Sequence, residues 1–125
     1  MIAIERIDHV VLTVASIEAT CAWYARVLGM EVREFGGRKA LHFGRQKINL
    51  HAIGAEIEPK APNAGPGTGD LCLITAAPIE DVLAHLRASG VEVLQGPVTR
   101  TGALGPIESV YLRDPDGNLI EISVC

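Results

Sequence analysis

The chain has 125 residues, of which 48% are hydrophobic and 21% charged, and its formal net charge at pH 7 is −4. This length and composition indicate one globular domain and exclude a disordered chain. The acidic balance and the lack of a basic run argue against nucleic acid and anionic membranes as partners. The first 14 residues include Glu5, Arg6 and Asp8, and the three cysteines show no paired spacing. We therefore expect a cytoplasmic protein without a membrane span.

The first half of the chain predicts one strand, one helix and three further strands. Ser16 is expected to cap the helix and Gly29 to end it, because serine favours the first position and glycine the left-handed last one. Alternation of apolar residues and glycine turns place the strands at 4–14, 30–35, 38–43 and 46–51. These elements form a first βαβββ module over residues 4–52. The segment 53–69 contains three prolines and four glycines and is expected to be a linker.

The second half, residues 70–125, predicts the same order of elements. Pro78 is expected to open its helix as a first-turn residue and Gly90 to close it. The turn Arg113–Asn118 has the sequence RDPDGN, and apolar residues alternate on both sides of it, as in a β-hairpin. Strands are expected at 70–75, 91–94, 106–113 and 118–124, with a loop at 98–105. The fold class expected from both halves is α+β, with two tandem modules whose mixed sheets curve around a cleft.

The repeat pairs chemically active positions of the two modules. With an offset of 61 residues, His9 corresponds to Asp70, whereas the starts of the two helices align better with an offset of 62. On the closing strands, matching Ile48-Asn49-Leu50-His51 to Asn118-Leu119-Ile120-Glu121 makes His51 correspond to Glu121. Each of these four residues is flanked by the apolar row of its strand, so each is expected on the opposite face.

Pairing of the two modules about a pseudo-twofold axis would gather two imidazoles and one or two carboxylates. Two histidines and one carboxylate suit a divalent metal such as Fe, Zn, Ni or Mn, which polarises a carbonyl as a Lewis acid. We therefore expect His9, His51 and Glu121 to be metal ligands. The simpler interpretations are a structural histidine for His9, a strand-end residue at the mouth of the loop for His51 and a solvated carboxylate for Glu121. Asp70 has four candidate roles, namely a fourth ligand, an outer hydrogen-bond acceptor, a general base or a strand cap.

The βαβββ repeat, His9 within IDHVVLTV and the ending RDPDGNLIEI resemble the vicinal oxygen chelate superfamily. That superfamily includes glyoxalase I, fosfomycin-modifying thiol transferases, extradiol dioxygenases and bleomycin-resistance proteins. The resemblance covers essentially the whole chain. The stretches QKINLH, EPKAP, DLCLIT and the segment 96–123 are most similar to glyoxalase-domain-containing protein 5 and its bacterial relatives.

The resemblance implies ligand roles for His9 and Glu121. Glyoxalase I typically has a carboxylate at the position that corresponds to His51 and a histidine at the position that corresponds to Asp70. The histidine and the carboxylate at these two positions are therefore exchanged in this chain. The catalytic candidates are Glu121 and Asp70. Tyr111 and Arg113 lie on the face opposite to Val110 and Leu112 and are candidates for binding an anionic substrate, although Arg113 is equally suited to the turn.

The resemblance implies a metal-dependent lyase or isomerase acting on a small molecule with two adjacent oxygens. An extradiol-type dioxygenase is one alternative, although those enzymes typically resemble two such domains in tandem. The other is a metal-free drug-binding protein of the bleomycin-resistance kind, which the aromatic content of 4% disfavours. A homodimer is implied, and the modules pair either within one chain or across two.

Overall fold

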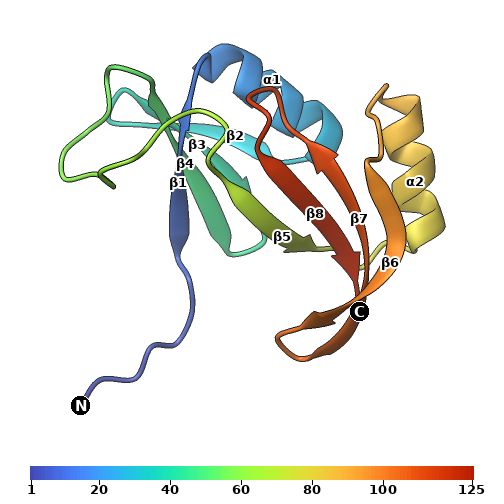
Figure 1. Cartoon of the computed structure of the whole chain (residues 1–125). Coiled ribbons are helices and arrows are strands. Elements are labelled where there is room, and N and C mark those ends of the chain that lie inside the picture. Colours follow the sequence, from blue (N-terminus) through green and yellow to red (C-terminus); the bar gives the residue numbers. More distant parts are fainter. The chain divides into compact units, whose positions relative to one another are not determined.

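The computed structural model describes residues 1–125, which divide into two units. The first unit is Met1–Pro66 and the second is Gly67–Cys125, so their boundary lies inside the segment expected to be a linker. Each unit contains one βαβββ module with a four-stranded mixed sheet (Figure 1). The expected α+β class with two repeated modules is confirmed. Neither helix has the length and apolar composition that crossing a lipid bilayer requires.

The first unit contains one helix and a sheet of strand order β1-β4-β3-β2. β1 runs parallel to β4, and the other two pairs are antiparallel. The elements are β1 (His9–Val14), α1 (Ile17–Leu28), β2 (Glu31–Phe35), β3 (Arg38–Phe43) and β4 (Gln46–Ala52). The first strand was expected to begin at residue 4, but Ile4 and Ile7 are exposed and precede it.

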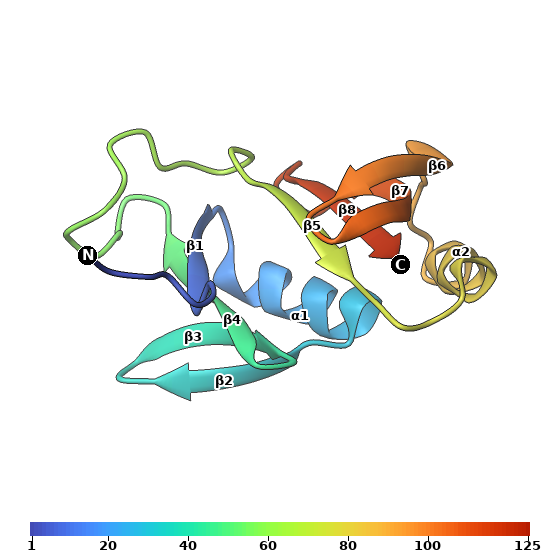
Figure 2. The same ribbon diagram turned by 90° about the horizontal axis from the view of Figure 1, so that it is seen from below.

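Helix α1 has the predicted bounds and caps. The Ser16 side chain accepts a hydrogen bond from the Ala19 amide at 3.1 Å, and Gly29 ends the helix in the left-handed conformation with φ 66°. The helix packs along one face of the sheet against β2, β3 and β4 (Figure 2). Tyr24 and Val27 are buried there with Leu41 and Ile48, so the apolar row of the sheet faces α1. The other face is left for polar residues.

The second unit repeats this plan with strand order β5-β8-β7-β6. Its elements are β5 (Asp70–Ile74), α2 (Ile79–Ala88), β6 (Gln95–Gly102), β7 (Gly105–Arg113) and β8 (Leu119–Val124). β5 runs parallel to β8, and α2 lies next to β6 and β7 in both views of the chain (Figures 1 and 2). Pro78 stands one residue before the helix as its N-cap, and not in the first turn as expected.

Two predictions for the second unit are wrong. Residues 91–94 form no strand, and residues 98–105, expected to be a loop, include most of β6 and the start of β7. β6 is the edge strand of its sheet, and Thr99, Arg100 and Thr101 are all exposed. An edge strand with solvated side chains on both faces shows no apolar alternation, so the sequence pattern did not reveal it.

The turn before β8 is built by one buried carboxylate. Asp114 Oδ1 accepts hydrogen bonds from the amides of Asp116 at 3.0 Å and Asn118 at 2.9 Å. Asp114 Oδ2 accepts a third from the Asn118 side chain, whose own oxygen accepts from the Gly69 amide at 2.7 Å. The turn is therefore fixed to the start of β5, and it sets the register in which β8 lies between β5 and β7.

Candidate functional site

Glu121 is the centre of a row of side chains that crosses the second sheet. On β8 it lies directly opposite Cys72 on one side and Tyr111 on the other. Residues that pair across neighbouring strands point to the same face, so these three side chains share one surface. Val110, Leu112, Ile120 and Ile122 face the other way and are buried. The expected placement of Glu121 and Tyr111 opposite the apolar row is confirmed.

A pocket of about 750 Å³ lies over this row, within the second unit. Its polar wall includes Cys72, Arg100, Tyr111 and Glu121. Its apolar wall includes Ile74, Leu104 and Ile107. The volume is in the range of small-molecule sites, which combine apolar walls with a few oriented polar groups.

Glu121 has few protein partners within this pocket. The Ser123 hydroxyl donates to Glu121 Oε2 at 3.4 Å, and Ser123 is itself 2.7 Å from the Ser109 hydroxyl. Both serines are fully buried, so their hydroxyl groups are held in place next to the carboxylate. A half-buried carboxylate whose neighbours are only the Ser123 hydroxyl, at long range, and the Cys72 thiol keeps lone pairs available for a proton or a cation.

The Cys72 thiol belongs to the same cluster. Its sulfur lies 3.3 Å from the Ser123 hydroxyl. Although the Cys72 residue is exposed, partial desolvation of its sulfur raises the pKa of the thiol, and the neighbouring Glu121 carboxylate adds to this rise, while the hydrogen bond with Ser123 opposes it. The neutral thiol is therefore favoured, which makes Cys72 a weak nucleophile in this surrounding.

The two residues expected to bind substrate differ in position. Tyr111 lines the pocket, whereas Arg113 Nη1 donates to the carbonyl of Gly117 at 3.2 Å on the turn. Arg100 on β6 lines the pocket instead, with Nε donating to the Tyr111 hydroxyl at 2.9 Å. Arg100 was missed because its segment was expected to be a loop.

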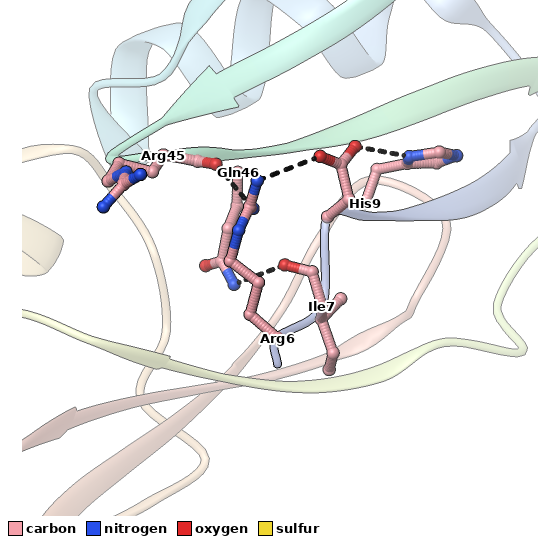
Figure 3. Close-up of polar contacts among 6 residues, drawn as sticks. Arg6, Ile7, His9, Arg45 and Gln46 are labelled. Atoms are coloured by element: carbon pink, nitrogen blue, oxygen red, sulfur yellow. Dashed lines mark hydrogen bonds and ion pairs between the residues drawn. The ribbon is translucent and has the colours of Figure 1, made fainter. Parts of the chain in front are cut away.

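His9 of the first unit has one ring nitrogen committed to a neighbour. Its Nδ1 lies 2.9 Å from Oδ2 of Asp8, and Asp8 also pairs with Arg6 at 3.5 Å (Figure 3). The hydrogen bond from His9 lowers the pKa of Asp8. The segment before β1 is held by Gln46, whose side chain donates to the Ile7 carbonyl at 3.1 Å. When Nδ1 donates to Asp8, the exposed Nε2 is left with its lone pair free, as in histidine metal ligands held by a carboxylate.

His51 does not occupy the position that the sequence repeat assigned to it. In β1 and β4, His9 pairs with Lys47 and Val11 pairs with Asn49. In β5 and β8, Asp70 pairs with Leu119 and Cys72 pairs with Glu121. With His9 equivalent to Asp70, the residue equivalent to Glu121 is Asn49. The predicted correspondence of His51 with Glu121 is wrong by two residues, since the match was made on similar letters and not on strand pairing.

His51 is buried and lies four residues further along β4 than Lys47, the partner of His9. At about 3.3 Å per residue this places His51 about 13 Å along the sheet from His9. His9 and His51 are therefore attached at separate positions along the same face of the first sheet.

Asn49 is a second residue that the sequence did not single out. Its Oδ1 atom is buried and has no hydrogen-bond partner. Asn49 shares a sheet face with His9 and lies one diagonal step away, a separation of about 7–8 Å between Cα atoms. A buried amide oxygen without a donor is costly unless it has a partner, and a cation is one kind of partner.

Asp70 opens β5 and is exposed. It shares the face of Cys72, and its strand neighbour Leu119 is two residues before Glu121. The two carboxylates therefore have the same diagonal relation as His9 and Asn49 in the first unit. The role of Asp70 as a base or a ligand stays a prediction.

The donor types fit a divalent metal. Imidazole nitrogen, carboxylate and amide oxygens are ligands of Fe, Zn, Ni and Mn sites. No group of three His, Cys, Asp or Glu side chains lies close enough together in the structure to hold an ion. Each module instead contains one pair of candidate donors, His9 with Asn49 and Asp70 with Glu121.

Comparisons with known proteins agree with this fold. Residues 6–122 match the family described as the Glyoxalase/Bleomycin resistance protein/Dioxygenase superfamily. The chain is 55% identical over 121 residues to virulence protein STM3117 of Salmonella typhimurium, covering 96% of this chain and 84% of that protein. It is 52% identical over 123 residues to glyoxalase domain-containing protein RDO1 of Mycosarcoma maydis, covering 98% of this chain and 69% of that one.

A solved structure gives the same result. The integron cassette protein VCH_CASS1 from the mobile metagenome of V. cholerae superposes with a TM-score of 0.96 at 54% identity, covering 99% of this chain and 98% of that one. Both the sequence match and the structural match extend over nearly the whole chain. The chain therefore belongs to the glyoxalase/bleomycin resistance protein/dioxygenase superfamily.

Proposed function

We propose that the protein is a metal-dependent enzyme with glyoxalase-like lyase or isomerase chemistry, acting on a small molecule with adjacent oxygen atoms. We also propose that it groups with the glyoxalase-domain proteins of its family, to which its similarity to RDO1 points. The observation that carries the proposal is the place of Glu121. Its carboxylate is nearly free of protein partners and lies in the wall of a pocket with apolar sides.

In this proposal His9 and Glu121 are ligands of one divalent ion. His9 is suited to this role by the hydrogen bond of Nδ1 to Asp8, which fixes the ring and leaves Nε2 available. Asn49 is proposed as an oxygen donor, because its position repeats that of Glu121 and its Oδ1 has no protein partner. His51, expected from the sequence, is the competing candidate for this place.

A bound divalent ion would supply Lewis-acid polarisation of the substrate's oxygens. The chain's own residues would bind and orient the substrate and move a proton. Tyr111 faces the pocket beside Glu121 and can donate or accept a hydrogen bond there. Glu121 or Asp70, which share this face, would take a proton from one carbon and return it to its neighbour.

The test uses protein freed of metal with a chelator and then reloaded separately with Fe(II), Zn, Ni or Mn. Each form is assayed with methylglyoxal plus a thiol, for thioester formation, and with catechol and oxygen, for ring cleavage. We expect thioester formation with one or more metals, reduced about 100-fold or more in Glu121→Gln. Glu108→Gln is the matched control, since Glu108 is an exposed glutamate on β7 that lies on the face of the sheet opposite to Glu121.

Two results would contradict the proposal. Ring cleavage with Fe(II), without thioester formation, would establish the dioxygenase alternative. Turnover with none of the metals, together with tight binding of apolar ligands by metal-free protein, would favour a small-molecule binding protein. The apolar pocket wall of Ile74, Leu104 and Ile107 is the observation that favours this second candidate.

A further inference from the structure

The β6–β7 hairpin brings an arginine to the pocket of the second unit. Arg100 pairs with Ile107, which is four residues before Tyr111 on β7, so all three share one face of the sheet. Its side chain reaches along β7 to Tyr111, and both residues line the pocket. Arg100 thus lies on the same surface as Glu121, with Tyr111 directly opposite Glu121 in the sheet.

The guanidinium of Arg100 is held in one orientation. Nε donates to the Tyr111 hydroxyl at 2.9 Å, and Nη1 donates to the Thr99 carbonyl at 3.3 Å. The guanidinium carbon lies 5.5 Å from the centre of the Tyr111 ring. Because these contacts fix the side chain before a ligand arrives, less conformational entropy is lost when the ligand binds.

The positive charge of Arg100 has no carboxylate partner in the protein. Arg33 pairs with Glu31 at 3.0 Å and Arg6 with Asp8 at 3.5 Å, whereas no acidic group lies within ion-pair distance of Arg100. Nη2 and the second hydrogen of Nη1 are left for a ligand. These two parallel N–H groups match the two oxygens of a carboxylate.

We propose that Arg100 is the specificity residue of this pocket and binds the carboxylate of a small substrate whose apolar part lies against Ile74, Leu104 and Ile107. The inference rests on the proposed function in taking the pocket as the substrate site. A carboxylate is favoured over a phosphate because Arg100 is the one cationic side chain in the pocket wall and Glu121 repels a second negative charge. A short-chain α-keto or α-hydroxy acid combines this carboxylate with adjacent oxygens.

The test measures binding to metal-free protein by calorimetry, with chelator present. The probes are α-ketoisocaproate, which has a branched apolar end, and its neutral methyl ester. We expect the acid to bind at least about tenfold more tightly than the ester, because a hydrogen-bonded charge pair is lost with the ester. Arg100→Gln should abolish this preference and Arg100→Lys should keep part of it. Tyr111→Phe should reduce it severalfold by releasing the guanidinium.

Two control variants distinguish carboxylate binding by Arg100 from a general effect of the protein's positive charges. Arg87→Gln removes the same charge from the exposed surface of α2 and should leave the preference unchanged. Equal binding of acid and ester, no binding of either, or loss of the preference in Arg113→Gln but not in Arg100→Gln would each overturn the proposal. The measurement needs no metal, so a failed metal-dependent assay and a failed carboxylate site give different results.

Discussion

At the scale of single residues, Cys72 reports directly on the surroundings of Glu121. Partial desolvation and the adjacent carboxylate raise the pKa of the thiol. The folded state therefore favours the neutral thiol, so this contribution to stability is present below the unfolded pKa and is lost as pH rises through the folded one. We expect alkylation of Cys72 to begin at higher pH in the folded protein than in urea.

Mass spectrometry of the alkylated peptide containing Cys72, over a pH series, measures this difference. Glu121→Gln should move the alkylation profile to lower pH, because the variant removes the negative charge beside the sulfur. Glu108→Gln should not move it, since Glu108 lies on the other face of the sheet. An unchanged profile in Glu121→Gln would show that Cys72 and Glu121 are not neighbours in solution, and a folded-state profile at or below the one in urea would contradict the raised pKa.

The sequence correctly predicted the sheet face of those residues whose orientation follows from the alternation of apolar and polar residues along a strand. His9, Asp70, Tyr111 and Glu121 were placed on the polar faces of their strands by alternation alone, and the pairing registers confirm this placement. Asn49 was missed because its role depends on which residue of β1 it pairs with. The alignment of the two modules by similar residue types was wrong by two residues on β4, and the strand register corrected it.

At the scale of elements, β6 depends on a glycine where it approaches β7. Gly96 has φ 109°, and a Cβ atom there would overlap the Ser109 carbonyl oxygen. The pairing of β6 with β7 shifts register between Gln95 and Val98, next to this point. A glycine is therefore required for the backbone conformation and also for the close contact.

We predict that Gly96→Ala lowers the free energy of unfolding much more than Gly44→Ala. Gly44 also has positive φ, at 52°, but a Cβ there meets no atom within 4 Å. Gly44→Ala should cost about 1–2 kcal/mol for the left-handed conformation. Gly96→Ala should cost about 1–3 kcal/mol more because of overlap with the backbone. Urea denaturation measures both, and equal losses would contradict the described contact between β6 and β7.

The elements that the sequence predicted have strong local signals. Helix α1 was found with its bounds because Ser16 and Gly29 mark its ends and Cys21 and Tyr24 mark its buried side. The hairpin of β7 and β8 was found from its turn. β6 was missed because it is an edge strand whose position depends on a close backbone contact at Gly96. Neither feature produces an alternation of apolar residues in the sequence. Arg100 was lost with it.

At the scale of the whole molecule, the chain is a duplicated module with donors distributed between the copies. His9 and Asn49 occupy one module, and Asp70 and Glu121 occupy the equivalent places in the other. The metal-ligand roles of these residues stay predictions. The homodimer implied by the family resemblance also stays a prediction, which sedimentation equilibrium of the full chain tests.

The most direct test of this account is the metal content of the purified protein after loading with each ion and gel filtration. We predict about one ion per chain in the parent protein, lost in His9→Gln and Glu121→Gln and kept in Glu108→Gln. Loss in Asn49→Ala, with retention in His51→Gln, would assign the oxygen donor to Asn49, and the reverse would assign the place to His51. A full complement of metal in both His9→Gln and Glu121→Gln, or no metal in the parent protein, would contradict the account.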